Sequence, residues 1–311
     1  MKTLLITGIG GDIAQAIAQI VRETYPNWRL IGMDIHERHA GRTAVDSVIV
    51  SPAASSPRYG MWLESTLDVH KVDLCLPTSE TELAYLVSSK LMERQPKRFV
   101  MPNRSAVEVG GDKYLTARHL CAYGIAGPWT VVVKPTSPIP DLPCIFKARR
   151  SAGSKAVFVC RTPEDVSYFQ NRYADAIFQE LLLPDDREVT VAVYRNQQGH
   201  VAVLQLLRKL TGGFTSWAEV IDDPEITAQC KKLAESLDLR GSINVQLRQT
   251  EAGPRIFEIN ARFSSTVLIR HRMGYCDALW ALEEAQGRAA TFYTPPVGTV
   301  AVRVQDALVL R

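Results

Sequence analysis

Short apolar runs alternate with amphipathic segments along the first hundred residues. The runs predict buried strands, which lie at residues 3–8, 29–35, 72–78 and 98–103. Between them, helical spacing of apolar side chains starts just after Asp12, which is placed to cap that helix, and a second helix is predicted over residues 79–91, with Ser79 at its start. Strands that alternate with helices predict a parallel sheet covered on both faces, the α/β part of the chain.

The pattern changes after about residue 104, and strands come to dominate. Asp112 is placed to cap a helix over residues 113–123, and a proline-rich connector follows over residues 128–143. Helices are predicted at residues 163–173 and 224–239. A strand–loop–strand unit is predicted at residues 143–160, and further strands at residues 176–182, 188–195 and 200–209. This part of the chain is therefore expected to be α+β.

The last two predicted strands carry polar side chains at alternate positions and form a hairpin whose turn lies near Ala252. Glu258 and Asn260 share one face because side chains alternate along a strand, and the turn sets them opposite Gln246 and Asn244. Glu258, Asn260 and Gln246 all offer oxygen, the ligand type that Mg2+ prefers. A half-exposed hairpin whose polar face meets water is the alternative.

Basic residues near this hairpin and elsewhere favour a phosphate site. Arg262 lies on the same face as Asn260, an order of charges that suits a phosphate. Lys147 ends a strand, and the small and basic residues 149–155 after it can fold over phosphates and offer backbone N–H groups. A flexible hairpin tip would have the same composition as this loop. Lys113, at the start of a predicted helix, is by itself interpreted as a solvated lysine.

A segment between a strand and a connector has the form of an adenine-binding hinge. Gln179, Glu180, Leu181 and Leu182 can place a backbone N–H and C=O against the edge of a base. Glu188, a few residues later, can accept hydrogen bonds from ribose hydroxyls, or it is an ordinary acid at a strand edge.

Composition narrows the class of protein. Hydrophobic residues make up 46% of the 311 residues and the net charge is +3, which favours an ordinary globular chain and gives no support to a nucleic-acid partner. The six cysteines are scattered without the spacing of a zinc site, and no apolar stretch is long enough for a membrane span. We therefore expect no membrane partner and a cytoplasmic location.

Taken together, these segments resemble the ATP-grasp superfamily, in particular the branch of the carbamoyl-phosphate synthase large chain and biotin carboxylase, over nearly the whole chain. Most specific is GSINVQL followed by RIFEINARFSS, which is similar to the N-V-Q and E-x-N-P-R segments of that branch. GGDKYLTARHLCAYGIAGPWT resembles the D-K helix with G-I-P-x-P-x-T, and KARRSAGSKAVFV resembles K-P-R-x-G-x-G-S-K-G-V. The departures, at Ala148, Ala261, Ser151, Ala152 and Ala156, affect lid geometry and remove no side-chain ligand.

The resemblance implies a Rossmann-like N-terminal domain followed by the two-lobed ATP-grasp fold. On this basis residues 1–103 form the N-terminal domain, residues 104–182 the linker helix and lid subdomain, and residues 183–311 the C-terminal subdomain that carries the metal hairpin.

The resemblance also implies ATP and Mg2+, with Mn2+ as an alternative metal. The metal ligands would be Gln246, Glu258 and Asn260. Arg262 would act beside the reacting phosphate, and Lys209 is favoured over Arg208 for the γ-phosphate. The implied nucleotide-binding residues are Lys113, Lys147, Ser151, Gly153, Ser154, Gln179, Glu180, Leu181, Leu182 and Glu188.

The implied activity is that of a ligase that joins a small carboxylic or amino acid to an amine through an acyl phosphate. The alternatives are an enzyme that forms carboxyphosphate or carbamoyl phosphate, and an ATP-binding module without catalysis. Arg270, His271 and Arg272 are candidates for the substrate carboxylate, with a solvated basic segment as the alternative. A homodimer is the expected assembly.

The N-terminal GIGGDIA invites a rival interpretation as a dinucleotide-binding loop, with Asp34 as the ribose acid. Ile13 occupies the third glycine position of GxGxxG, so the fingerprint does not fit. Tight NADH binding to residues 1–103 would revive the oxidoreductase interpretation.

Overall fold

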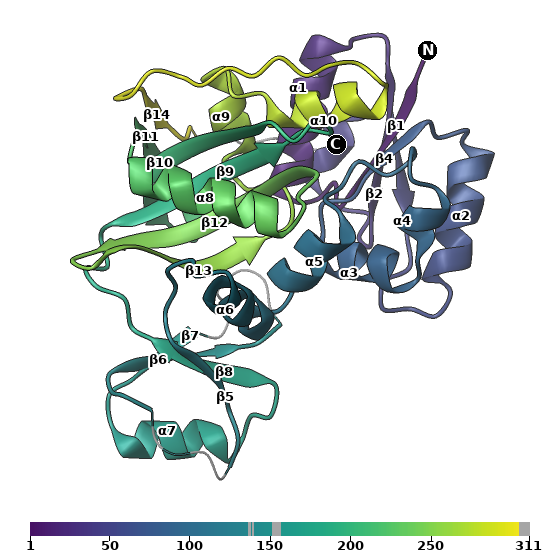
Figure 1. Ribbon diagram of the computed structural model, residues 1–311. Coiled ribbons are helices and arrows are strands. Elements are labelled where there is room, and N and C mark those ends of the chain that lie inside the picture. Colours follow the sequence, from purple (N-terminus) through teal and green to yellow (C-terminus); the bar gives the residue numbers. More distant parts are fainter. Residues whose placement is uncertain (136–137, 139, 151–156, 305–311) are drawn as a thin grey trace.

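The computed structural model describes residues 1–135, 138, 140–150 and 157–304, which form three sheets (Figure 1). The first sheet is parallel, with strand order β3-β2-β1-β4. Its strands are β1 (Thr3–Thr7), β2 (Arg29–Asp34), β3 (Ser47–Val50) and β4 (Leu74–Leu76). The predicted parallel sheet is thus confirmed, with β3 as a strand that the apolar pattern did not predict.

The strand predicted at residues 98–103 is wrong. Phe99 makes one isolated parallel bridge with Cys75, closed by Cys75 N to Arg98 O at 2.7 Å and Val100 N to Cys75 O at 2.8 Å. Pro102 follows, which has no N–H to continue a ladder. The segment is therefore a single pairing at the edge of the sheet.

Helices cover this sheet. Asp12 was expected to cap the first one but is its first residue; Gly11 stands at the N-cap and no side chain caps it. Ser79 does cap its helix, because its Oγ accepts from Glu82 N at 3.3 Å. The elements are α1 (Asp12–Thr24), the 3-10 helix η1 (Ala40–Thr43), α2 (Tyr59–Val69), α3 (Glu80–Ser88) and α4 (Leu91–Arg94).

Two short helices, α5 (Arg104–Gly110) and α6 (Lys113–Ala122), lead from this sheet to the rest of the chain. The predicted cap of α6 is confirmed, since Asp112 Oδ1 accepts from Tyr114 N at 3.0 Å and Leu115 N at 3.3 Å. Asp112 also pairs with Arg149 at 2.7 Å, which ties the helix to the second sheet.

The second sheet is antiparallel, with order β5-β8-β6-β7, and lies at the bottom of Figure 1 with α7 (Pro163–Gln170) beside it. Its core contains packed aromatic side chains, and the rings of Phe146 and Phe169 stack with centroids 3.9 Å apart. The strands are β5 (Thr130–Val132), β6 (Cys144–Ala148), β7 (Val157–Cys160) and β8 (Ala176–Glu180).

The third sheet is the largest, with order β13-β12-β9-β10-β11-β14 and every neighbouring pair antiparallel. Helix α8 (Pro224–Ser236) packs on it through Ile226, Cys230, Leu233 and Ala234, which are all buried. The strands are β9 (Glu188–Arg195), β10 (Val201–Thr211), β11 (Phe214–Ile221), β12 (Gly241–Thr250), β13 (Gly253–Asn260) and β14 (Val300–Val302).

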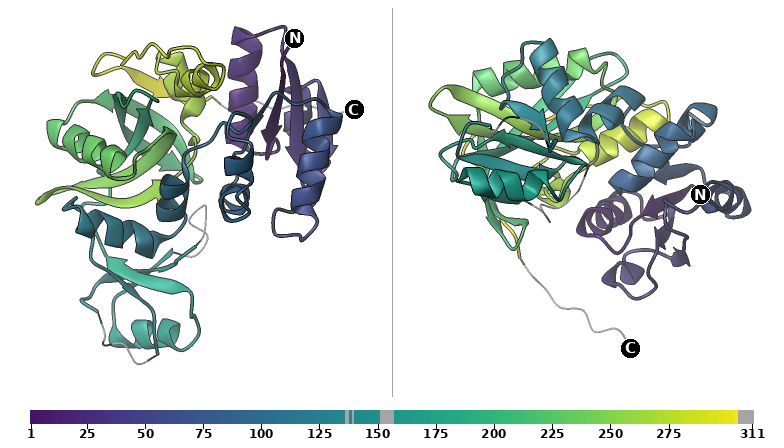
Figure 2. Two further views of the ribbon diagram at one scale, coloured as in Figure 1. Left: turned by 45° about the vertical axis from the view of Figure 1, so that its right-hand side comes forward. Right: turned by 90° about the horizontal axis from the view of Figure 1, so that it is seen from below.

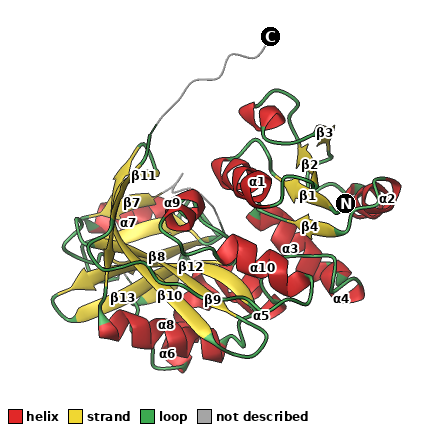
Figure 3. Cartoon of the chain, turned by 90° about the horizontal axis from the view of Figure 1, so that it is seen from above, coloured by secondary structure: helices red, strands yellow, loops and turns green. Residues whose placement is uncertain are grey.

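Segments far apart in sequence join the first and third sheets. Helices α9 (Val267–Arg272) and α10 (Asp277–Ala285) pack against α1, and the core around α1 includes Phe263, Val267 and Leu282 (Figures 2 and 3). The segment after β13 is therefore held on the N-terminal sheet. Within the described ranges no helix has the length and apolar character needed to cross a membrane.

Candidate functional site

The hairpin of β12 and β13 has the predicted register. Gln246 lies opposite Glu258 and Asn244 lies opposite Asn260. A bulge follows between Gln246 and Leu247, so that Phe257 has no partner in the ladder. An extra residue in one strand re-aims the side chains beside it, and Phe257 and Glu258 consequently both line the same cavity.

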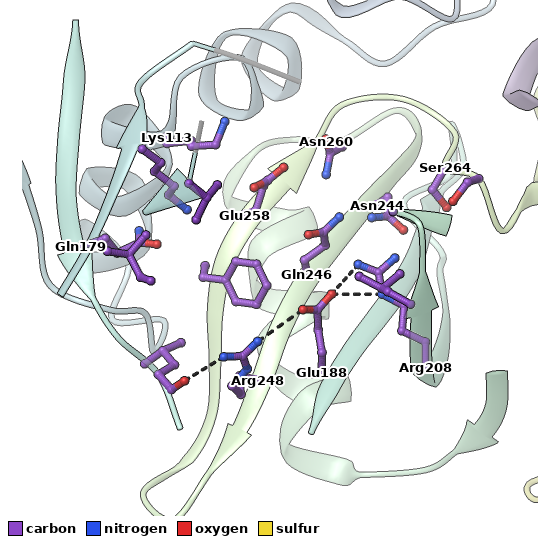
Figure 4. Close-up of a pocket in the computed structure, with 18 of the residues that line it drawn as sticks. Lys113, Gln179, Glu188, Arg208, Asn244, Gln246, Arg248, Glu258, Asn260 and Ser264 are labelled. Atoms are coloured by element: carbon purple, nitrogen blue, oxygen red, sulfur yellow. Dashed lines mark hydrogen bonds and ion pairs between the residues drawn. The ribbon is translucent and has the colours of Figure 1, made fainter. Parts of the chain in front are cut away.

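That cavity has a volume of about 440 Å³ and is lined by strands of the second and third sheets, with the first residues of α1 and α6 (Figure 4). It brings together eleven residues that were assigned from the sequence to nucleotide, metal or phosphate binding. They are Lys113, Lys147, Gln179, Glu180, Leu181, Leu182, Glu188, Gln246, Glu258, Asn260 and Arg262. Residues as far apart in sequence as Lys113 and Arg262 thus converge on one site.

Lys113 is the first residue of α6 and Lys147 lies on β6, and both lysines are buried. Lys147 is 5% exposed, and burial lowers its pKa to about 8, with the Glu258 carboxylate acting to raise it and the charge of Lys113 to lower it. A buried ammonium group facing a cavity is a ready partner for an anion, because water no longer solvates it fully.

Glu188 lies between two arginines (Figure 4). Arg208 donates to Glu188 Oε1 through Nε at 3.1 Å, and Arg248 Nη2 lies 3.4 Å from Oε2. Arg248 also donates to the carbonyl oxygen of Leu182 at 2.8 Å. One guanidinium therefore links the proposed ribose acid to the proposed hinge.

The hinge itself is braced at two side chains. Glu180 accepts from Arg255 at 2.8 Å and from the backbone N–H of Trp129 at 3.2 Å, and Gln179 donates to Thr130 Oγ1 at 2.9 Å. Leu181 and Leu182, which follow these two residues, are also part of the cavity wall.

The donor set near the hairpin suits a magnesium ion held between protein and phosphates. Gln246, Glu258 and Asn260 supply one carboxylate and two amides, and Asn260 Oδ1 also accepts from Arg262 at 3.2 Å. One carboxylate and two amides would bind Mg2+ weakly by themselves, so the remaining oxygen ligands would come from a nucleotide and water.

The comparisons with known proteins agree with this geometry. A family model described as "ATP-grasp in the biosynthetic pathway with Ter operon" matches residues 174–307. An N5-carboxyaminoimidazole synthetase from Staphylococcus aureus complexed with ADP superposes with a TM-score of 0.77, at 16% identity, covering 95% of this chain and 80% of that one. The chain has the ATP-grasp fold. The two-lobed fold and the family resemblance predicted from sequence are thereby confirmed.

Two further solved structures share the fold. The biotin carboxylase domain dimer of Hydrogenobacter thermophilus 2-oxoglutarate carboxylase, in complex with MgADP, ADP and bicarbonate, has a TM-score of 0.76 at 13% identity, covering 96% of this chain and 73% of that one. An L-amino acid ligase from Bacillus licheniformis has a TM-score of 0.72 at 15% identity, with 92% and 74% covered. The sequence has no match among the curated proteins.

The structure corrects the choice of Lys209 within this ATP-grasp cavity. Successive side chains of β10 point to opposite faces, so Arg208 lines the cavity and Lys209 does not. Lys209 is exposed and its ammonium lies 5.8 Å from the ring centroid of Trp217. The alternative left open at the sequence level, Arg208, is the residue that faces the site.

Replacing Arg208 with Ala should weaken MgATP binding by about tenfold or more, because the change leaves the Glu188 carboxylate without its main partner in a partly buried site. The neighbouring Lys209→Ala is the matched control and should change the affinity by less than about twofold, as exposed substitutions usually do. Calorimetric titration with MgATP measures both. A larger loss at Lys209 than at Arg208 would contradict the assignment.

The prediction for the basic triplet, residues 270–272, is also corrected. Arg270 is fully buried and makes a bidentate pair with Asp277, Nε to Oδ1 at 2.8 Å and Nη2 to Oδ2 at 2.7 Å, while Nη1 donates to Ser264 Oγ at 2.9 Å. It cannot meet a substrate, since all these donors are engaged inside the protein. Its role is structural: it fixes Ser264, which lines the cavity.

The other two members of the triplet lie outside the cavity as well. Arg272 is an exposed partner of Glu23 at 2.6 Å, and burial, followed by the charge of Arg272, lowers the pKa of His271. The predicted lid residues Ser151, Gly153 and Ser154 lie outside the described residues.

Several residues of the cavity wall were not assigned a role from the sequence. Arg248 was visible in the alternation of the β12 side chains, whereas alternation along β10 says only that Arg208 and Lys209 point to opposite faces. Phe257 could not be found this way, because only the bulge turns it toward the cavity. Asp12 and Ser265, from distant parts of the chain, both line the cavity, and α9 packs against α1 beside them.

Proposed function

We propose that the chain is an Mg-ATP-dependent ligase that joins a small carboxylic or amino acid to an amine through an acyl phosphate. The observation that carries the proposal is the single cavity in which Glu258 and its two amide neighbours face Lys113, Lys147 and Arg262. Positive groups and a divalent-ion donor set at one point are what phosphoryl transfer requires. Solved structures of this fold with ADP and MgADP support the nucleotide.

In the proposed reaction a carboxylate oxygen of the acid attacks the γ-phosphorus of ATP. The bond from that phosphorus to the bridging oxygen breaks, and ADP leaves with the electron pair. The amine nitrogen then attacks the acyl carbon, phosphate leaves with the electrons of the C–O bond, and the nitrogen loses a proton. The products are an amide, ADP and phosphate.

The residues of this chain would act by position and charge. Lys113 and Lys147 would neutralise the nucleotide phosphates, and Arg262 would stabilise the charge that develops on the transferred group. Gln246, Glu258 and Asn260 would hold Mg2+, which supplies further charge neutralisation when bound. The hinge backbone and Glu188 would hold adenine and ribose, with Glu188 oriented by Arg208 and Arg248.

Formation of carboxyphosphate from bicarbonate is the second candidate. It is favoured by the names of two neighbours, an N5-carboxyaminoimidazole synthetase and a carboxylase domain that holds bicarbonate. The L-amino acid ligase favours the first candidate. Both candidates share the attack of a carboxylate oxygen on the γ-phosphate, and they differ in the acid.

The test is an ADP-release screen of the purified chain with MgATP across pairs of small acids and amines, with a separate bicarbonate series. The ligase predicts ADP only when acid and amine are both present. Bicarbonate-dependent ADP release without an amine would select the second candidate. MgATP binding with no turnover across the whole screen would contradict both and leave a nucleotide-binding module. Sedimentation of the same sample tests the proposed homodimer.

A further inference from the structure

An ion pair connects the phosphate end of the cavity to the N-terminal sheet. Arg262 Nη2 lies 2.9 Å from Glu80 Oε1, and the two side chains are 17% and 29% exposed. Arg262 follows β13, whereas Glu80 is the first residue of α3. Two parts of the chain more than a hundred residues apart therefore meet at the side chain assigned to the reacting phosphate.

The guanidinium of Arg262 is also held from its own segment. Nη1 donates to the carbonyl oxygen of Phe263 at 3.1 Å, and Nη2 donates to Asn260 Oδ1 at 3.2 Å. The contact with Glu80 is an ion pair without an aligned hydrogen bond. Glu80 Oε1 is buried, and the nearby Arg262 Nη2 is not oriented to donate to it. Glu80 therefore acts on Arg262 mainly through its charge.

Glu80 stands on a fixed support. Its helix is capped by Ser79, and the buried Glu82, in the same first turn, accepts from Tyr59 at 2.6 Å and from Thr7 at 2.5 Å. These bonds anchor the start of α3 to α2 and to β1. A carboxylate carried by an anchored helix end can hold a flexible guanidinium in one direction, which lowers the entropy lost when a ligand binds.

We propose that Glu80 is a positioning residue for Arg262, which aligns the guanidinium with the γ-phosphate of bound nucleotide. The inference rests on the proposed function, because it takes Arg262 to face that phosphate. Glu80 does not line the cavity, so it would act through Arg262. It also restrains Asn260, since the Arg262 guanidinium that it attracts donates a hydrogen bond to Asn260 Oδ1.

The test compares the affinities of the intact chain for MgADP and for the magnesium complex of AMP-PNP, an ATP analogue that keeps the γ-phosphate position. The ratio of the two affinities reports contacts to that phosphate alone. Glu80→Gln should reduce the preference for AMP-PNP by about tenfold, the scale of a lost charged interaction in a partly buried site, and should change MgADP affinity by less than about twofold. Glu80→Asp, which keeps the charge on a shorter side chain, should give an intermediate ratio.

A matched control is Glu64→Gln, which removes a carboxylate paired with Arg94 at 3.4 Å in the same part of the chain but remote from the cavity, and should leave the ratio unchanged. In an Arg262→Gln background, Glu80→Gln should cause no further loss, because residues that act through one another are not additive. A structural role of Glu80 elsewhere would give additive losses and would overturn the proposal.

Two other outcomes also decide the matter. An increased preference for AMP-PNP in Glu80→Gln would mean that Glu80 restrains Arg262 away from phosphate, and the proposal would be wrong. If the wild-type chain bound neither nucleotide, the proposed function itself would be wrong. If it bound both, and Glu80→Gln left the ratio of the AMP-PNP and MgADP affinities unchanged, only the role of Glu80 would be wrong.

Discussion

Glu258→Gln should lower ATP turnover by about 100- to 1000-fold, the range seen when one preorganised electrostatic group is lost from an active site. The substitution keeps the shape of the side chain and removes the one carboxylate in a donor set that otherwise consists of the amides of Gln246 and Asn260. We expect the Mg2+ dependence of ATP binding to flatten at the same time. Titration of nucleotide affinity against Mg2+ concentration, alongside ADP release with the acid and amine found in the screen, measures both effects.

The matched control lies at the tip of the same hairpin. Glu251→Gln removes a carboxylate from the exposed turn between β12 and β13, where it does not line the cavity, and should leave both measurements unchanged. If Glu258→Gln kept the full Mg2+ dependence of the wild-type chain, the metal would have to be held elsewhere, and the assignment of the hairpin would be wrong.

Lys147→Ala should weaken ATP binding by about 100-fold, because a buried charge that pairs with a phosphate is removed. The wild-type protein should also lose ATP affinity as the pH rises through about 8. The sign follows from the lowered pKa: the ammonium form binds phosphate, and above its pKa the free protein carries a neutral amine. Binding must then supply a proton, so affinity falls on the alkaline side.

Lys147→Arg distinguishes charge from shape. The guanidinium stays protonated across this range, so the alkaline loss of affinity should disappear even if the affinity at neutral pH is lower than that of the wild type. ATP affinity measured from pH 6.5 to about 9.5 gives the profile. A wild-type profile that is flat through pH 8, or an unchanged alkaline loss in Lys147→Arg, would exclude Lys147 as the titrating group.

Local pattern was sufficient for much of the fold. The turn near Ala252 and the alternation of side chains placed Glu258 opposite Gln246, because register in a hairpin depends only on the turn and the period of two. The cap by Asp112 was also local, since a carboxylate reaches the amides of the next turn without help from the rest of the chain. The pattern was less reliable for residues 98–103, where an apolar run forms only one bridge before Pro102.

Whether a side chain faces the cavity, the core or solvent was harder to predict from the sequence near the ends of strands and helices. Lys209 and Arg208 are neighbours of similar charge, and only the orientation of β10 within its sheet decides that Arg208 faces the cavity. Arg270 was a candidate for binding the substrate carboxylate, with a solvated position as the alternative. It is buried because Asp277, on the next helix, balances its charge, a partnership that depends on how α9 and α10 pack together.

Short-range periodicity and side-chain chemistry were enough to predict the parallel sheet, the hairpin register and the groups of residues that suit phosphate and magnesium, although they missed β3 and misplaced a strand at residues 98–103. Tertiary structure alone decided that Lys147, Glu188 and Glu258 line one cavity, and that Glu80 reaches Arg262 from the N-terminal sheet. The physical reason is that contacts between distant segments are fixed by the packing of whole sheets and helices. No local pattern encodes the position of one sheet relative to another.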